Sequence, residues 1–465
     1  MRRYIVLRPI MSVSLVLLIL HTLCPTAQAV LKGGCSKVNI TPPLGIALTG
    51  SAGKPSSDIA DELYAKALVL DDGSTTIAIV SADLLYVPLE EITNPVREII
   101  KEKIGIPEQN VLIYATHTHS GPEVFTKSKL GPEEQIPASK IDQFYLATLV
   151  RKIASSVLIA YTKMQQVKIG AAKGEIPEIV YNRRPKSKDG SVKMTFTLSD
   201  EITATRAIVQ GPEGSVRVTF TLPSKEPELV FGPVDPEVLV FRVEDTNGQI
   251  VGSIVNFACH PVCIYPHLPT SISADYPAYA TQVVEQMEGG TCLFALGTAG
   301  NIVPVRRGVR PRQQIGRALG GEALRRLQLV STSGDVTLKA VRREIRLPTK
   351  KPPSADGTAN DSKTTGYVKT ELQVLKLGNI YLLCLPGEVL VEVGFQIKKR
   401  AGLENLFVVT LSNDTIGYVC HSQAYEEGGY EPASATNLAK GAGEAMIEQA
   451  LDLVNQIKPR STASP

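Results

Sequence analysis

The chain has 465 residues, of which 43% are hydrophobic and 20% are charged, and this composition excludes global disorder. Lysine and arginine number 49 against 46 aspartate and glutamate residues, and the excess equals the three arginines Arg2, Arg3 and Arg8. The remainder is neutral and contains no Trp. A neutral body with few aromatic rings lacks the basic surface and stacking platforms that nucleic acids need, so we expect no nucleic-acid partner.

Residues 1–29 have the pattern of a signal peptide. The three arginines precede an apolar run at 10–20, and A-Q-A at 27–29 is a small-residue cleavage site. The alternative is an uncleaved membrane anchor, although the apolar run is shorter than the ~18 residues that a comfortable span requires. We therefore predict a secreted or periplasmic protein.

Short apolar runs rich in β-branched residues alternate with helical patterns along the chain, which predicts an α/β protein. Strands are expected at 76–82, 110–115, 250–258, 292–296, 380–385 and 406–411. Helices are expected at 89–103, 140–164, 276–286, 311–329, 391–401 and 436–457. Because the strand segments are nearly continuous in apolar residues, we expect mixed sheets that are flanked by helices and buried on both faces.

Two regions depart from this alternation. Residues 347–366 are rich in Pro, Gly, Lys and Ser, which predicts a mobile surface loop. Residues 183–236 contain a local duplication, with G-S-V-K-M-T-F-T-L at 190–198 and G-S-V-R-V-T-F-T-L at 214–222. Both copies alternate apolar and polar residues, so we expect a duplicated β-hairpin insert, either at a sheet edge or as a flap near the functional site.

Residues able to bind a metal follow three of the expected strands. They are His117 and His119 after the strand at 110–115, His260 after the strand at 250–258, and Glu388 after the strand at 380–385. In open α/β sheets, ligands bind beyond the carboxyl ends of the strands, so these side chains are expected to meet there.

Histidines and a carboxylate with an open position are the usual ligands of catalytic zinc. Taken alone, a histidine is more often a hydrogen-bonded core or turn residue than a ligand, but the H-x-H pair at a strand end favours a site. A glycine-rich turn at 297–302 could hold an oxyanion through its N–H groups, and a plain tight turn is the alternative. The chain has no G-x-S-x-G elbow, which disfavours a serine α/β-hydrolase.

Five motifs in this order resemble those of the neutral/alkaline non-lysosomal ceramidases. They are N-I-T-P-P at 39–43, T-H-T-H-S-G-P at 116–122, F-A-C-H-P at 257–261, P-G-E at 386–388 and Y-E-E-G-G-Y-E at 425–431. The resemblance extends over residues 33–458, and the T-H-T-H-S-G-P block is its most specific part.

The resemblance implies a zinc amidase that cleaves the N-acyl bond of ceramide with metal-activated water. It implies Zn²⁺ ligands at His117, His260, Glu388 and Tyr425, the last because Tyr425 and Tyr430 keep the family spacing of five residues. It further implies His119 as an acid/base group. Oxyanion stabilisation would come from Arg183, or its neighbour Arg184, and from the loop at Gly300 and Asn301.

The chain also departs from the family pattern. The family motif N-x-G-D-V-S-P aligns with T-A-G-N-I-V-P at 298–304, where Asn301 replaces the aspartate and Val303 replaces the serine. A covalent serine mechanism is therefore excluded at that position, whereas a metal-activated water mechanism needs only ligands and a base. We expect one ceramidase-like catalytic domain over residues 30–465, without the C-terminal β-sandwich domain of the family.

The sequence thus favours a secreted zinc-dependent hydrolase that acts on a small-molecule or lipid amide. A ceramidase-fold binding protein without turnover is one alternative, and a zinc esterase or lactonase with a small substrate is another. Peripheral contact with a membrane surface and the oligomeric state stay open.

Overall fold

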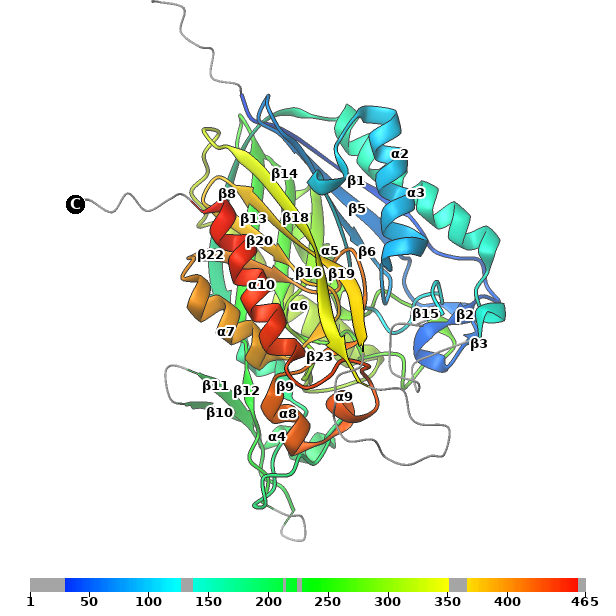
Figure 1. Cartoon of the computed structure of the whole chain (residues 1–465), viewed down its shortest axis with the longest axis vertical. Coiled ribbons are helices and arrows are strands. Elements are labelled where there is room, and N and C mark those ends of the chain that lie inside the picture. The colour runs from blue at the N-terminus through cyan, green and yellow to red at the C-terminus, as the bar shows by residue number, and fades with distance from the viewer. Residues whose placement is uncertain (1–29, 127–136, 212–214, 224–227, 351–365, 459–465) are drawn as a thin grey trace, which may run out of the picture.

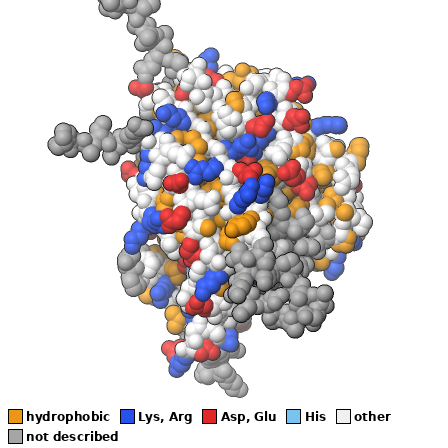
Figure 2. All heavy atoms as spheres, viewed as in Figure 1, with side chains coloured by type: hydrophobic (Ala, Val, Ile, Leu, Met, Phe, Trp, Pro, Cys, Tyr) orange, Lys and Arg blue, Asp and Glu red, His pale blue; other side chains and the backbone are white. Residues whose placement is uncertain are grey.

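The structure is a computed structural model that describes residues 30–126, 137–211, 215–223, 228–350 and 366–458. The expected signal peptide at 1–29 lies outside these residues. Four layers stack on one another: helices, an eight-stranded sheet, a four-stranded sheet and a second set of helices (Figure 1). Basic and acidic side chains are interspersed over the face drawn in Figure 2, where neither sign gathers into a patch.

The eight-stranded sheet has the order β16-β14-β13-β8-β1-β5-β6-β7. Its strands are β1 (Lys32–Asn39), β5 (Tyr64–Asp71), β6 (Thr76–Ala82), β7 (Val111–Ala115), β8 (Gln165–Glu175), β13 (Glu237–Asp245), β14 (Ile250–Phe257) and β16 (Thr291–Leu296). Strands β6 and β7 pair in parallel, as do β14 and β16, while the other pairs are antiparallel. The sheet is therefore mixed, as expected.

The four-stranded sheet has the order β18-β19-β20-β22. It contains β18 (Leu338–Thr349), β19 (Gly366–Leu377), β20 (Ile380–Cys384) and β22 (Asn405–Val409), of which β20 and β22 are parallel. The remaining strands are short and form small ladders around the site and the insert. They are β2 (Ala47–Leu48), β3 (Lys54–Pro55), β4 (Asp58–Ile59), β9 (Val180–Asn182), β10 (Ala207–Gln210), β11 (Val216–Thr219), β12 (Pro233–Val234), β15 (Ser271–Ile272), β17 (Ile302–Pro304), β21 (Glu388–Val389) and β23 (Tyr418–Val419).

Helices cover the two outer faces. The eight-stranded sheet is covered by α2 (Asn94–Ile104), α3 (Gln143–Thr162), α5 (Asp275–Glu288) and α6 (Val309–Leu327). The four-stranded sheet is covered by α7 (Val391–Ala401) and α10 (Ala442–Ile457). Short helices are α4 (Asp200–Ala204), α8 (Ser422–Glu427) and α9 (Tyr430–Ala433), with single turns at η1 (Thr49–Ser51), η2 (Leu89–Thr93), η3 (Glu108–Asn110), η5 (Ala138–Lys140) and η6 (Pro177–Ile179).

The two-residue period of the strands explains why both faces of the large sheet are buried. In β5, Leu68 and Leu70 enter the layer between the two sheets, whereas Ala67 and Val69 face the helices. This arrangement requires apolar residues at successive positions, so the continuous apolar strands are explained. Helix α3 is long and apolar enough by length and composition to cross a membrane, but its apolar face packs on β1 and β5.

All the expected strands and helices are present, with one late start, since α10 begins at Ala442 rather than at 436. The loop expected at 347–366 is shorter than predicted, because its first residues belong to β18 and its last residue, Gly366, pairs with Thr349 as the start of β19. Residues 351–365 lie outside the described part of the chain.

The insert differs from the expected duplicated hairpin. The second copy forms β11, which pairs with β10 and β12, but the first copy forms no strand. The backbone of the first copy bonds elsewhere: Thr195 N donates to Arg183 O and Val192 N donates to Glu427 O. Equal local sequences thus take different structures, because their tertiary partners differ.

Candidate metal centre

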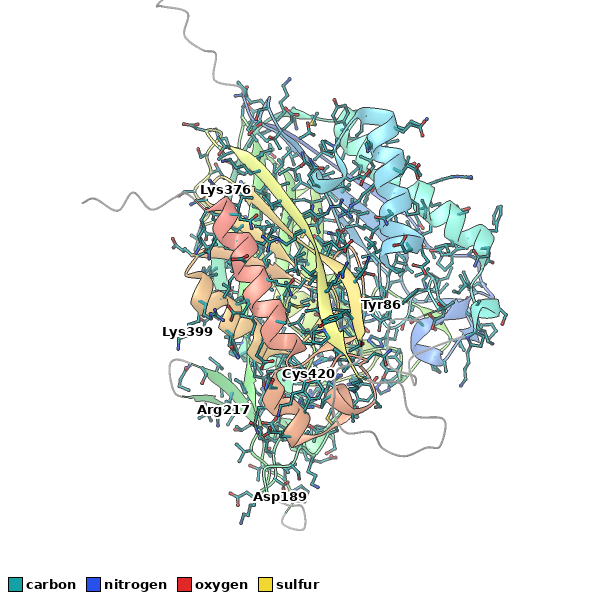
Figure 3. The ribbon with its side chains drawn as sticks, viewed as in Figure 1. Tyr86, Asp189, Arg217, Lys376, Lys399 and Cys420 are labelled. Atoms are coloured by element: carbon teal, nitrogen blue, oxygen red, sulfur yellow. The ribbon has the colours of Figure 1, made fainter. Side chains whose placement is uncertain are left out.

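The site forms where the carboxyl ends of parallel strands from both sheets meet. Thr410 N, just past β22, donates to Leu296 O at the end of β16, so the two sheets are joined at this edge. Figure 3 marks the edge with Tyr86 and Cys420, whereas Lys376 lies at the opposite end of the sheets. This placement follows the rule for open α/β sheets that the sequence analysis used.

His117 is fully buried two residues past β7. Its backbone has φ +70°, a left-handed conformation that is rare for a residue with a β-carbon, and its N–H donates to Leu84 O. The ring Nδ1 lies 3.0 Å from Leu85 O. A carbonyl can only accept, so Nδ1 carries the proton and Nε2 keeps a lone pair.

His260 follows β14 and has the same arrangement. Its Nδ1 lies 2.5 Å from Ala299 O, and its Nε2 lies 3.0 Å from Glu388 Oε2. Burial lowers the pKa of His260 to about 4, so the ring is neutral at neutral pH. Its Nε2 therefore also presents a lone pair to the centre.

Glu388 begins β21 and faces both rings. Its Oε2 lies 3.2 Å from His117 Nε2 and 3.0 Å from His260 Nε2. The other oxygen, Oε1, accepts a 3.1 Å hydrogen bond from the Tyr86 hydroxyl.

These groups fit a divalent cation. The Nε2 atoms of both imidazoles face the same carboxylate oxygen, and His117 Nε2 has no hydrogen-bond partner among the described residues. Buried acceptors that point at one another repel unless a positive charge lies among them. The Nδ1–carbonyl bonds are the orienting contacts that metal-binding histidines make.

His119 completes a histidine cluster at the site. Donor atoms of His117, His119 and His260 all lie within 4.8 Å of one another, and this cluster could bind a metal. The ring of His119 stacks on Tyr265 at 5.2 Å and is only half-buried, unlike the other two. Its position suits a group that exchanges protons at the outer side of the centre.

A tyrosine does join the centre, but the predicted one is wrong. Tyr425 lies on α8, and its hydroxyl donates to Leu438 O, away from Glu388. Tyr418 takes the place instead: its hydroxyl lies 3.4 Å from His260 Nε2. The reason is strand pairing, because β23 runs parallel to β21 with Tyr418 directly opposite Glu388.

Arg183 lies beside this phenol rather than free in the site. Its Nη2 donates to Tyr418 Oη (3.0 Å) and to Gly300 O (2.9 Å), and its Nε donates to Glu431 Oε1 (2.8 Å). Arg184 pairs with the other oxygen of Glu431 at 2.5 Å. Arg183 therefore orients Tyr418. Burial raises the pKa of Tyr418 well above its usual value, and the positive charge of the Arg183 guanidinium acts in the opposite direction.

The contacts of Gly300 and Asn301 differ from those expected of an oxyanion-binding loop. Gly300 N donates to Val389 O, so that amide is not available to a substrate. A β-carbon on Gly300 would lie 2.8 Å from the Val389 carbonyl carbon, which explains the glycine. Asn301 is fully buried, and its side chain accepts from Val391 N and donates to Glu392 Oε2. Gly300 thus connects the loop to β21, the strand that carries Glu388, and Asn301 connects it to the start of α7.

Three residues at or beside the centre were given no role from the sequence: Tyr86, Tyr418 and Glu431. Tyr86 lies four residues past β6, so the strand-end rule could have found it. Glu431 belongs to the Y-E-E-G-G-Y-E motif but was given no role there. Tyr418 lies in a short apolar segment that resembles core, and only the pairing of β23 with β21 reveals it.

Comparisons with solved structures identify the fold. Over 94% of its length the chain matches the fold of a crystal structure of neutral ceramidase from Pseudomonas aeruginosa, with TM-score 0.70, 19% identity and 76% of that chain covered. A second structure, titled ceramidase complexed with C2, matches over the same share with TM-score 0.69, 17% identity and 77% coverage. The chain therefore has the ceramidase fold, with a buried histidine cluster at the ends of its strands.

The sequence comparisons find similarity to the same group of proteins. Residues 32–190 match the family model for neutral/alkaline non-lysosomal ceramidase, N-terminal. Neutral ceramidase B from Dictyostelium discoideum is 26% identical over 242 residues, which are 51% of this chain and 28% of the relative's length. The resemblance inferred from the motifs is thus confirmed: the chain is a relative of the neutral/alkaline non-lysosomal ceramidases.

Proposed function

We propose that this protein is an exported, zinc-dependent amidohydrolase that cleaves the N-acyl bond of ceramide or a closely similar N-acyl lipid. The observation that carries the proposal is the convergence of two imidazole lone pairs, one carboxylate oxygen and one phenol on a single buried point. Export is inferred from the first 29 residues of the sequence alone.

The residues that would hold the cation are His117, His260, Glu388 and Tyr418. When bound, zinc supplies Lewis acidity and lowers the pKa of a coordinated water to about 7. These four side chains come from strand ends that are fixed by backbone hydrogen bonds, so their positions need little reorganisation.

The remaining chemistry belongs to the chain's own groups. His119 is the half-buried histidine of the cluster, so it can accept a proton from water and return it to the departing amine nitrogen. Arg183 donates a hydrogen bond to the Tyr418 hydroxyl oxygen, which holds the phenol in place beside His260. No serine nucleophile is supplied at position 303, because the residue there is Val303, which is buried and pairs with Tyr181 in the β17–β9 ladder.

The proposal is tested with purified protein loaded with zinc. We expect about one zinc per chain by elemental analysis and release of fatty acid from a fluorescent N-acyl sphingosine, both abolished by a chelator. His117→Ala should lose the metal and the activity, because it removes an imidazole that a buried dication requires. His267→Ala is the matched control, since His267 is exposed and outside the cluster.

The same experiment separates the alternatives. Protein that binds zinc but turns over no N-acyl compound would be a binding protein with the ceramidase fold. Hydrolysis of esters or lactones without amide hydrolysis would indicate the esterase alternative. Absence of zinc after reconstitution would contradict the proposal itself.

A further inference from the structure

The duplicated motif of the insert supplies two phenylalanines at equivalent positions. Phe196 is the seventh residue of the copy at 190–198, and Phe220 is the seventh residue of the copy at 214–222. Because their local sequences are nearly the same, any difference in their surroundings reflects tertiary structure rather than local preference.

Phe220 packs inside the fold. Its ring lies 5.5 Å from Tyr181 and 5.2 Å from Phe231, in edge-to-face contacts typical of aromatic cores. Both of these partners are buried. Phe220 thus anchors the insert on β9, and its role is structural.

Phe196 is 41% exposed and contacts the site instead. Its ring centroid lies 5.3 Å from the Arg183 guanidinium carbon and 5.7 Å from the ring of Tyr430. A single exposed apolar ring is ordinary by itself. Phe196, however, contacts Arg183, the arginine that orients Tyr418, so this exposed ring lies next to the candidate site.

A row of rings connects Phe196 with the metal centre. Tyr430 lies 5.7 Å from Tyr418, and Tyr418 stacks on His260 at 6.4 Å. The guanidinium of Arg183 lies over the rings of Phe196, Tyr418 and Tyr430, at 5.3, 5.6 and 5.9 Å. Three ring contacts therefore lead from an exposed apolar side chain to a candidate metal ligand.

The segment that carries Phe196 is held firmly in this position. Thr195 N donates to Arg183 O, and Val192 N donates to Glu427 O. Gly429, between α8 and α9, has no room for a β-carbon because Met194 Sδ and Val192 Cγ1 would lie 3.1 Å from it. The exposed ring of Phe196 is thus part of a packed surface. By contrast, Asp189, at the distal tip of the insert, lies well away from Tyr86 at the strand ends (Figure 3).

We propose that Phe196, together with Tyr430, determines substrate specificity by contacting the apolar chain next to the scissile amide. The inference rests on the proposed function and deepens it, because it selects long-chain N-acyl amphiphiles over short N-acyl compounds. An exposed aromatic ring gains apolar burial when an alkyl chain covers it, and the acyl chain attached to the reacting carbonyl must pass close to the centre.

The test compares N-acyl sphingosines with two-carbon and twelve-carbon acyl chains. Phe196→Ala should lower kcat/KM for the twelve-carbon substrate about 5–30-fold and for the two-carbon substrate less than about twofold, because only the long chain covers the ring. Phe196→Leu should restore part of the loss. Phe220→Ala, the matched control, should lower thermal stability and leave the ratio between the two substrates unchanged.

Equal losses for both substrates in Phe196→Ala would overturn the inference, since Phe196 would then act only by shielding Arg183. If the wild type hydrolyses neither substrate, the proposed function fails, and the inference is judged by binding of a fluorescent twelve-carbon ceramide measured by anisotropy. Affinity weaker by about 5–30-fold in Phe196→Ala would support it. Equal affinity, or no binding by the wild type, would overturn it.

Discussion

At the scale of single residues, one phenol decides how the candidate metal centre is completed. Tyr418 lies 3.4 Å from His260 Nε2 and accepts a hydrogen bond from Arg183, whereas Tyr425 donates to Leu438 O outside the centre. Both are tyrosines within eight residues of each other, so the sequence offers no simple reason to prefer Tyr418. The parallel pairing of β23 with β21 provides that reason.

Replacing each tyrosine by phenylalanine distinguishes the two. Tyr418→Phe should weaken metal affinity and lower kcat by about 10–100-fold, the range seen when a group that orients or binds a metal is removed. Tyr425→Phe should leave both unchanged within about twofold, since its hydroxyl meets only a carbonyl. Metal titration and turnover assays measure both effects, and the opposite ranking would restore the interpretation based on the five-residue tyrosine spacing.

At the scale of elements, buried ion pairs connect layers whose residues lie far apart in the sequence. Arg97 of α2 donates to Glu371 Oε1 of β19 at 2.8 Å, and Arg342 of β18 donates to the other oxygen at the same distance. The Arg97 side chain is 1% exposed, so Glu371 is the counterion of a buried guanidinium. The contact joins a helix of one outer layer to the four-stranded sheet.

Glu371→Ala should lower the free energy of unfolding by about 3–5 kcal/mol, because it leaves a buried guanidinium without its counterion. The control is Glu344→Ala, directly across the ladder on β18, whose side chain is 63% exposed. We expect less than about 1 kcal/mol there, as for other exposed pairs. Urea denaturation measures both changes, and equal effects would contradict this account of the buried pair.

At the scale of the whole molecule, one buried carboxyl makes stability depend on pH. Asp83 accepts hydrogen bonds from Tyr64 N and the Thr116 hydroxyl, and thereby joins β5 to the start of the histidine motif. Burial raises the pKa of Asp83 from 3.8 to about 6. The folded state therefore holds this proton more tightly than the unfolded state does, and the resulting stabilisation is lost as the pH rises through about 4 to 6.

Asp83→Asn removes this titration. The unfolding free energy of the wild type relative to the variant should fall by about 3 kcal/mol between pH 4 and pH 7, as a shift of about two pKa units requires. Asp452→Asn is the control, because that side chain is 72% exposed. Denaturation at a series of pH values measures the difference, and a difference that stays constant with pH would show that Asp83 does not titrate in this range.

How far the sequence could predict the fold follows from the kind of signal each element carries. Strands such as β6 and helices such as α7 were predicted with the observed ends, because they are continuous apolar runs or have a clear helical period. Strands β8 and β18 were missed, since Lys, Arg and Gln interrupt their apolar residues where one face is partly exposed. The two copies of the duplicated motif show how far local sequence can predict structure, because one copy forms a strand and the other does not.

The sequence by itself determined the α/β class and the positions of His117, His260 and Glu388, because each lies at the end of an apolar strand where ligands of such sheets collect. It also revealed the resemblance to the neutral/alkaline non-lysosomal ceramidases, through motifs spread along the chain. Only the tertiary structure decided which tyrosine joins the centre, that Arg183 orients this phenol, and that Gly300 and Asn301 brace the loop. These choices depend on contacts between segments that lie far apart in the sequence, 90 residues for Asn301 and Val391 and 235 for Arg183 and Tyr418, or on strands only two residues long. Neither leaves a periodic pattern in the sequence.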